Sequence, residues 1–198
     1  MKHIVVNIGC EYGSGGPEIG KMVASDLGIE YYDRDLVDKV GEALDVDRTL
    51  VEQADNDTNV RFSFDTSLGP RTGNLTNKVI YTQFDVIRKM AQSRSCVIIG
   101  RCGNYILEGV TDSINVFVYA PEEVRVRAVM NEEHLSERKA QEVTRSRDRQ
   151  LHERYKYITG TNRGDRAYRD LMVDSSVLGW ARTARLIEAF VEMATETR

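Results

Sequence analysis

Short runs of apolar residues alternate along the chain with longer stretches in which apolar side chains recur every three or four positions. The runs at residues 4–8, 96–100 and 114–119 are rich in β-branched residues and predict buried strands. Residues 29–32 and 171–173 predict two shorter strands. The pattern therefore predicts a sheet of about five strands.

The stretches between these runs predict helices. Residues 18–27, 36–44, 79–91 and 176–194 carry apolar side chains at helical spacing, and residues 122–130 begin a further helix after a proline. Strands that alternate with helices indicate parallel βαβ units and a three-layer α/β fold. In such folds, ligands bind beyond the carboxyl ends of the strands.

Composition and charge limit the classes of protein to which the chain can belong. The 198 residues are enough for one domain with a full core. A net charge of −4 excludes the overall basic field of a nucleic-acid binder. No apolar run is long enough to predict a membrane span. The three cysteines form no CxxC pair, so neither a disulfide framework nor a zinc site is indicated, and a cytoplasmic location is expected.

The stretch "IGCEYGSGGPEIG", residues 8–20, lies between the first strand and the first helix. Gly13, Gly15 and Gly16 give the backbone the freedom to curl around phosphates in front of a helix N-terminus. Against the Walker A pattern GxxxxGK[ST], Cys10 replaces the first glycine, Gly16 the lysine and Pro17 the hydroxyl residue. Either a modified phosphate site or a tight turn without a ligand fits this stretch.

Two residues near the loop are candidates for the missing contacts. Lys21 lies one helical turn past Pro17, so its ammonium reaches the loop only by extending back along the helix. The alternative, an exposed helix lysine, is favoured by the sequence. Ser14 carries the only hydroxyl between Gly13 and Gly16 and is a candidate for a magnesium or phosphate contact.

Two charged residues follow strands at the same edge of the predicted sheet. Arg101 follows the strand at 96–100 and has the geometry to grip a phosphate with both arms of its guanidinium, or to form a salt bridge that caps the sheet. Asp33 follows the second strand and suits acceptance of a hydroxyl proton, or capping of the next helix. The glycine loop, Asp33 and Arg101 are therefore expected to share one crevice.

The densest basic cluster consists of Arg145, Arg147, Arg149 and Arg154. In a helix, Arg145 and Arg149 lie on one face. Clustered arginines suit phosphoryl transfer, in which charge spreads over the transferred group. The alternative is a solvated helix face paired with neighbouring carboxylates.

Five stretches in order resemble the cytidylate kinase-like family. They are "EYGSGGPEIG" at 11–20, "YYDRDLV" at 31–37, "VIIGRCGNYIL" at 97–107, "RSRDRQLHERYKYITG" at 145–160 and "YRDLMVDSSVLG" at 168–179. The resemblance covers most of the chain. It implies a P-loop NTPase fold of the nucleoside monophosphate kinase type, as a single domain over residues 1–198, with an acceptor-side insert at 53–77 and a helical lid at 131–166.

The resemblance also implies an activity. A member of this family is expected to move the γ-phosphoryl of ATP, with Mg²⁺, to a nucleoside monophosphate such as CMP or to another small acceptor. The residues of Gly13–Gly16 would hold the donor, Asp33 and Arg101 the acceptor, and Arg145 and Arg149 the migrating charge. Cys102 replaces the aspartate of the family's "GRD" motif.

Three other functions are compatible with the sequence. They are a nucleotide-binding regulatory module without turnover, a partner-binding domain that kept only the fold, and a kinase for a non-nucleotide acceptor. The missing lysine favours the first of them, and Cys102 keeps the last one open. The sequence does not indicate an oligomeric state.

Overall fold

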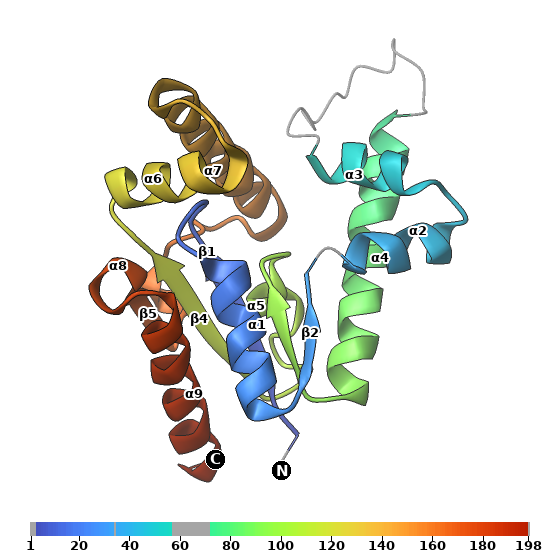
Figure 1. Cartoon of the computed structure of the whole chain (residues 1–198). Helices are drawn as coiled ribbons and strands as arrows, with labels where there is room; N and C mark the ends of the chain where they lie inside the picture. The colour runs from blue at the N-terminus through green and yellow to red at the C-terminus, as the bar shows by residue number, and fades with distance from the viewer. Residues whose placement is uncertain (1–2, 34, 57–71, 198) are drawn as a thin grey trace. The chain divides into compact units, whose positions relative to one another are not determined.

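The computed structural model describes residues 3–33, 35–56 and 72–197 (Figure 1). These residues form two compact units. Residues 3–33 and 91–197 make up the first, and residues 35–56 and 72–90 make up the second. Within the described residues, no helix is both long and apolar enough to span a membrane.

The first unit contains the sheet, and the predicted strands are confirmed. Its strands are β1 (Val5–Cys10), β2 (Glu30–Tyr32), β3 (Cys96–Ile99), β4 (Ser113–Tyr119) and β5 (Leu171–Asp174). They are all parallel in the order β2-β3-β1-β4-β5. The central strand β1 pairs with β3 and β4, so that Ile8 lies between Ile99 and Val116. The carboxyl ends of β1, β3 and β4 therefore meet at one edge.

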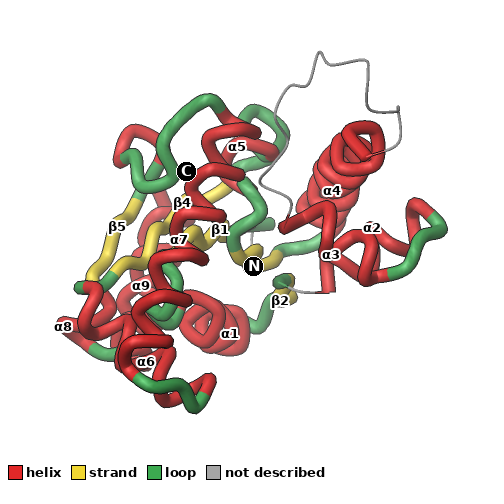
Figure 2. The backbone as a smooth tube through the Cα atoms, turned by 90° about the horizontal axis from the view of Figure 1, so that it is seen from above, coloured by secondary structure: helices red, strands yellow, loops and turns green. Residues whose placement is uncertain are grey.

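Helices cover both faces of this sheet, as the views in Figures 1 and 2 show. On one face lie α1 (Gly16–Leu27) and α9 (Trp180–Thr197), and on the other lies α5 (Gly103–Ile106). The helices α6 (Glu122–Glu133) and α7 (Glu137–Thr159) lie beyond the carboxyl ends of the strands, and α8 (Ser175–Leu178) directly follows β5. A 3-10 helix, Arg166–Tyr168, lies between α7 and β5. This arrangement confirms the predicted three-layer α/β fold.

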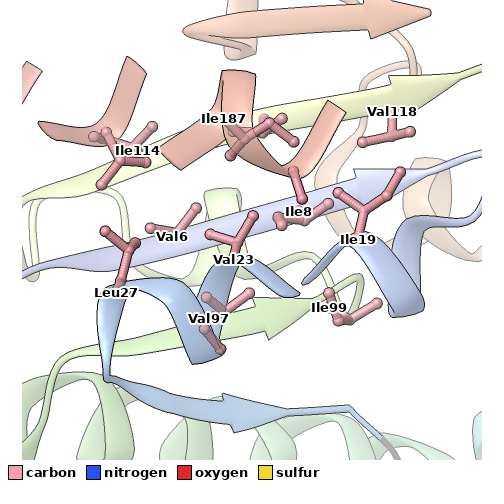
Figure 3. Close-up of a cluster of buried hydrophobic side chains, with 14 of the residues drawn as sticks. Val6, Ile8, Ile19, Val23, Leu27, Val97, Ile99, Ile114, Val118 and Ile187 are labelled. Carbon is pink, nitrogen blue, oxygen red and sulfur yellow. The ribbon is translucent and has the colours of Figure 1, made fainter. Parts of the chain in front are cut away.

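The main core lies between the sheet and the pair α1 and α9 (Figure 3). Val6 and Ile8 of β1, Ile19 and Val23 of α1, and Ile187 of α9 are all fully buried. Each such side chain contributes about 1.5–3 kcal/mol through loss of apolar surface to water. This packing fixes α1, and with it the glycine loop that precedes α1, against the end of β1.

The single helix predicted over residues 176–194 is wrong, because the chain breaks at Gly179. The backbone there has φ 73° and ψ 164°, which ends α8 and lets α9 start in a new direction. Burial along α9 does not follow the apolar residues alone. Thr183, Ala184 and Ile187 are buried, whereas Leu186 is 41% exposed. Apolar residues occur on two faces of this helix, so the spacing alone did not separate them.

The second unit is helical. It consists of α2 (Asp35–Leu44), α3 (Arg48–Asn56) and residues 72–90 of α4 (Thr72–Ser93). A small core of Val37, Val40, Val51 and Val79 holds these helices together. The polar composition of residues 53–77 predicts a loop or a poorly ordered segment, and this prediction is wrong at both ends, where α3 and α4 continue. Polar residues are tolerated on the outer side of a helix whose other side is packed. Residues 57–71 of that prediction lie outside the described residues.

Candidate functional site

The glycine loop joins the end of β1 to the start of α1. Gly13 and Gly15 adopt left-handed conformations, with φ of 80° and 84°. A Cβ at Gly13 would lie 2.7 Å from the carbonyl oxygen of Arg125, and one at Gly15 would lie 2.3 Å from the indole of Trp180. Both glycines are therefore required by backbone conformation and by packing, as the tight-turn interpretation also demands.

The loop nevertheless has the features of an anion site. Gly16 and Glu18 lie in the first turn of α1, where the helix itself supplies no carbonyl for their N–H groups. Pro17 has no N–H to offer. The positive end of the helix dipole adds to these donors at the carboxyl edge of the sheet. The phosphate-site interpretation of residues 13–16 thus agrees with the geometry.

Cys10 fills the space beside Gly16. A Cβ at Gly16 would lie 2.3 Å from Cys10 Sγ and 2.4 Å from Cys10 Cβ. Burial raises the pKa of the Cys10 thiol to about 11, and the charge of Arg163 acts in the opposite direction. Cys10 is therefore a neutral packing group, and it stands in the volume that a side chain at position 16 would need.

Ser14, the predicted contact for magnesium or phosphate, is only 1% exposed. Its hydroxyl donates to the carbonyl oxygen of Glu11 at 2.8 Å and is 3.3 Å from that of Val118. The described residues contain no cluster of three or more His, Cys, Asp or Glu side chains that would hold a metal ion. A metal contact at Ser14 stays a prediction, since in this structure the hydroxyl closes the loop onto β4.

Lys21 lies on the exposed side of α1 and pairs with Glu18 of the first turn. Its ammonium lies 3.7 Å from the carboxylate of Glu18 and 5.9 Å from the ring centroid of Tyr31, and its side chain is 60% exposed. This placement matches the exposed-lysine alternative. The predicted phosphate contact of Lys21 would require the side chain to leave both neighbours.

Asp33 lies at the edge of the loop region, as predicted. Its carboxylate is 3.4 Å from the hydroxyl of Tyr31, which is also 3.2 Å from the carbonyl oxygen of Pro17 in α1. The charge of Asp33 acts on the Cys10 thiol. Asp33 and the glycine loop are therefore neighbours at the carboxyl edge of the sheet.

The turn after β3 is strained. Gly100, Arg101 and Cys102 are three successive left-handed residues, with φ of 64°, 55° and 57°. Each of the two non-glycine residues costs about 1–2 kcal/mol in this conformation. Backbone strain of this kind is concentrated at functional sites, where surrounding contacts hold the chain in place. The turn brings Arg101 to the same edge as the glycine loop.

Four guanidiniums act on the Cys102 thiol beside this turn. Burial raises the pKa of that thiol to about 11, and the charges of Arg154, Arg163, Arg169 and Arg101, in that order, lower it. These arginines come from α7, from the segment after α7 and from the β3 turn. Distant parts of the sequence thus contribute to one cluster of positive charge, the arginine cluster, which consists of these four residues.

Arg169 is held between two aromatic rings. Its guanidinium lies 5.4 Å from the ring centroid of Phe117 and 5.6 Å from that of Tyr155. It donates to the carbonyl oxygen of Arg163 at 2.8 Å. Burial lowers the pKa of both Arg169 and Arg154. Guanidiniums kept away from water in this way bind anions more strongly than exposed ones do.

A second network of charges ties α7, a helix of the predicted lid, to the loop. Asp148 of α7 accepts from the backbone N–H of Tyr12 at 2.9 Å and forms an ion pair with Arg125. Arg125 is buried and also donates to the carbonyl oxygens of Ala120 and Tyr12, at 2.9 Å and 3.0 Å. Its Nε lies 3.2 Å from the carboxylate of Glu11.

The structure places Arg145 and Arg149, two of the predicted lid arginines, outside the arginine cluster, whereas Arg154 belongs to it. Arg145 is 59% exposed and pairs with Glu122 of α6 at 2.8 Å, and Arg149 is exposed. Their predicted roles would need a movement of α7. Sequence reasoning missed Arg163 and Arg169, which lie in a polar segment without helical or strand periodicity. Their signal was only their density among residues 160–170.

A cavity of about 650 Å³ borders the arginine cluster. It is lined by α5, the connection from α5 to β4, the end of α7 and the segment before β5. Its polar lining includes Asn104, Asn115, Tyr155, Arg169 and Asp170. Asn104 donates to the hydroxyl of Tyr155 at 2.9 Å. The volume suits a small molecule.

Solved structures share this fold along the whole chain. An uncharacterized protein from Eubacterium ventriosum is 22% identical, with a TM-score of 0.74, over 96% of this chain and 98% of its own. A shikimate kinase from Bacteroides thetaiotaomicron is 11% identical, with a TM-score of 0.58, over 96% and 98%. A gluconokinase from Sinorhizobium meliloti is 12% identical, with a TM-score of 0.52, over 99% and 98%. At these identities the likeness shows a P-loop kinase fold.

Family membership rests on a separate comparison. No curated protein matches the chain. The model of the cytidylate kinase-like family matches residues 5–177, which include all five strands, the glycine loop, the β3 turn and the arginine cluster. The match confirms the resemblance of the five sequence stretches. This chain belongs to the cytidylate kinase-like family.

Proposed function

We propose that the protein is a phosphotransferase that moves the γ-phosphoryl of ATP to a small acceptor, most specifically a nucleoside monophosphate such as CMP. The observation that carries this proposal is the arrangement of two arginines at the junction of β1 and the glycine loop, where Arg163 donates to the carbonyl oxygen of Cys10 and Arg169 donates to that of Arg163. Phosphoryl transfer needs positioning and neutralisation of charge more than covalent chemistry, and this edge offers both. Three free cysteines agree with a cytoplasmic reaction.

The donor phosphates would bind the N-terminal end of α1. The N–H of Gly16 and the left-handed backbone at Gly13 and Gly15 form the concave surface that such anions need. Mg²⁺ would supply further neutralisation of the polyphosphate. A contact between that ion and Ser14 requires the hydroxyl to leave the carbonyl oxygens of Glu11 and Val118.

The acceptor would lie between the loop and the β3 turn, near Asp33 and Arg101. An oxygen of the acceptor attacks the γ-phosphorus, the bond from that phosphorus to the β–γ bridging oxygen breaks, and ADP leaves. The guanidiniums of the arginine cluster stabilise the charge on the oxygens in transit. A phosphate acceptor attacks as an anion. A hydroxyl acceptor also needs a base, and Asp33 would serve as that base.

The runner-up function is a nucleotide-binding module without turnover. The observation that favours it is the absence of the loop lysine at position 16, where Cys10 fills the space that a side chain would need. Such a module would bind ATP and release no ADP. The two functions differ in turnover and not in affinity, so one assay separates them.

The test is a coupled ADP-release assay with ATP and Mg²⁺ over a panel of nucleoside monophosphates, with shikimate and gluconate added because structural neighbours carry those names. We expect turnover with one acceptor. Arg101→Ala should lower kcat/KM by about 100-fold or more. Arg94→Ala, an exposed arginine before β3 that pairs with Glu30, is the matched control and should change it by less than about twofold.

The same assay tests the predicted lid arginines. Arg145→Ala and Arg149→Ala should reduce kcat only if α7 moves toward the bound nucleotide, whereas Arg154→Ala should do so without such a movement, because Arg154 already belongs to the arginine cluster. ATP binding by calorimetry without turnover on any acceptor would favour the regulatory module. Absence of ATP binding would overturn both functions.

A further inference from the structure

The loop has lost its lysine through two coupled substitutions. A standard loop carries glycine where Cys10 stands and lysine where Gly16 stands. In this structure the Cys10 side chain lies where the Cβ of residue 16 would be, at 2.3–2.4 Å. A lysine at position 16 therefore cannot coexist with Cys10. The positive charge at the donor phosphates has to come from elsewhere in the chain.

Arg163 is the arginine that reaches the start of the loop. Its Nη2 donates to the carbonyl oxygen of Cys10, the last residue of β1. Its guanidinium lies 5.8 Å from the ring centroid of Phe117, which pairs in register with Gly9 of β1. The side chain is 13% exposed. The charge of Arg163 thus stands at the junction of β1 and the loop, shielded from solvent.

Arg163 is held in place both at its main chain and at its guanidinium. Arg169 donates to the carbonyl oxygen of Arg163 at 2.8 Å, so the main chain is held by a residue of the arginine cluster. On the guanidinium side, Nη1 lies 3.6 Å from Oδ1 of Asp148, which also accepts from the N–H of Tyr12 in the loop. Arg163 is therefore positioned in advance of ligand binding, which lowers the entropic cost of an anion contact.

We propose that Arg163 replaces the loop lysine and binds the polyphosphate of a nucleoside di- or triphosphate. This inference rests on the proposed function and names the residue that supplies its missing charge. A guanidinium is always charged and offers a planar pair of donors to phosphate oxygens, so it serves this purpose from a different direction than an ammonium does. Because Cys10 stands in place of the glycine and Gly16 in place of the lysine, the charge comes from the segment after α7.

The first test measures nucleotide affinity by calorimetry. Arg163→Met keeps much of the side-chain length and removes the charge. It should weaken the binding of ATP and ADP by about 10- to 100-fold, as loss of a charged hydrogen-bond partner does. Arg166→Met is the matched control, since Arg166 is exposed in the same segment; it should bind within about twofold of the wild type. Thermal melts verify that both variants fold.

The second test restores the standard loop. Gly16→Lys alone should destabilise the protein, whereas Cys10→Gly with Gly16→Lys should fold. Added to Arg163→Met, this pair should recover about tenfold or more of the lost ATP affinity. Such recovery is specific to a replacement of the lysine. If Arg163→Met fails to fold, Arg163→Lys carries the test, and should bind ATP about three- to tenfold more weakly because it loses the planar pair of donors.

The outcomes separate the two proposals. If the folded Arg163→Met variant binds ATP as tightly as the wild type, the assignment of Arg163 is overturned and the proposed function stands. A loss in Arg163→Met that the restored loop does not recover overturns the replacement of the lysine. Wild-type protein that binds no nucleotide overturns the proposed function, and the assignment of Arg163 with it.

Discussion

At the scale of single residues, alanine substitutions at two glycines of the first unit distinguish the effect of packing on stability from the effect of backbone conformation. Gly15→Ala introduces a Cβ at 2.3 Å from the Trp180 indole at φ 84°, whereas Gly28→Ala has nothing within 4 Å at φ 64°. The Gly28 variant should lose about 1–2 kcal/mol of unfolding free energy from its left-handed backbone. The Gly15 variant should lose about 1–3 kcal/mol more through overpacking. Urea denaturation of both variants measures the difference, and equal losses would contradict the Trp180 contact.

The strained β3 turn marks the limit of sequence reasoning at this scale. The left-handed conformation of Gly100 could be predicted from the sequence, because glycine adopts it without steric cost. Arg101 and Cys102 adopt the same conformation without being glycines. Their conformation is imposed by the surrounding fold, including the close approach of Gly103 to the side chain of Asn7, and no local pattern encodes it. The sequence predicted that Arg101 follows β3 at the carboxyl edge of the sheet, but it did not predict the backbone geometry of this turn.

At the scale of elements, Asp148 is the residue that fastens α7 to the glycine loop. Asp148→Asn weakens the ion pair with buried Arg125 and the hydrogen bond from the N–H of Tyr12. We expect a loss of about 1.5–3 kcal/mol in unfolding free energy, because both interactions involve a charged acceptor. Glu142→Gln, which affects only exposed pairs on the same helix, should cost less than about 1 kcal/mol. Chemical denaturation checks both, and similar losses would argue against this fastening role.

The elements themselves were predicted well where periodicity is strong. The strands β1, β3 and β4 are apolar runs rich in β-branched residues, and they were found because burial inside the sheet requires such a stretch. The edge strands β2 and β5 are short and only partly buried, and they were found from Tyr31 and Tyr32 and from the run at residues 171–173. The break at Gly179 was missed because apolar residues continue on both sides of it. Arg163 and Arg169 were missed for a different reason. Their segment is positioned by cation–π contacts with Phe117 and Tyr155, which depend on tertiary structure alone.

At the scale of the whole molecule, the three cysteines predict a dependence of stability on alkaline pH. Burial raises the thiol pKa from 9.0 to about 11 for Cys10 and Cys102 and to about 12 for Cys96. Between pH 9 and these values, the unfolded chain releases protons that the folded chain keeps. The thiol contribution to stability is therefore complete below pH 9 and is lost as the pH rises toward 11–12.

The measurement is the slope of unfolding free energy against pH from 8 to 11, in the wild type and in a variant with all three cysteines replaced by alanine. The wild type should lose stability more steeply, and identical slopes would show that the thiols do not contribute. All three cysteines belong to the first unit, so their alkylation in urea should also follow the unfolding of the unit that carries the sheet.

The contact between Trp180 and the loop has a practical consequence. Trp180 is the single tryptophan of the chain, and its indole lies against Gly15 at the start of α1. Its fluorescence emission is therefore an intrinsic reporter of the glycine loop, free of background from any other indole. A polyphosphate that settles on the loop changes the polarity next to the ring, so a titration in a cuvette follows binding in real time with no label and no coupling enzyme.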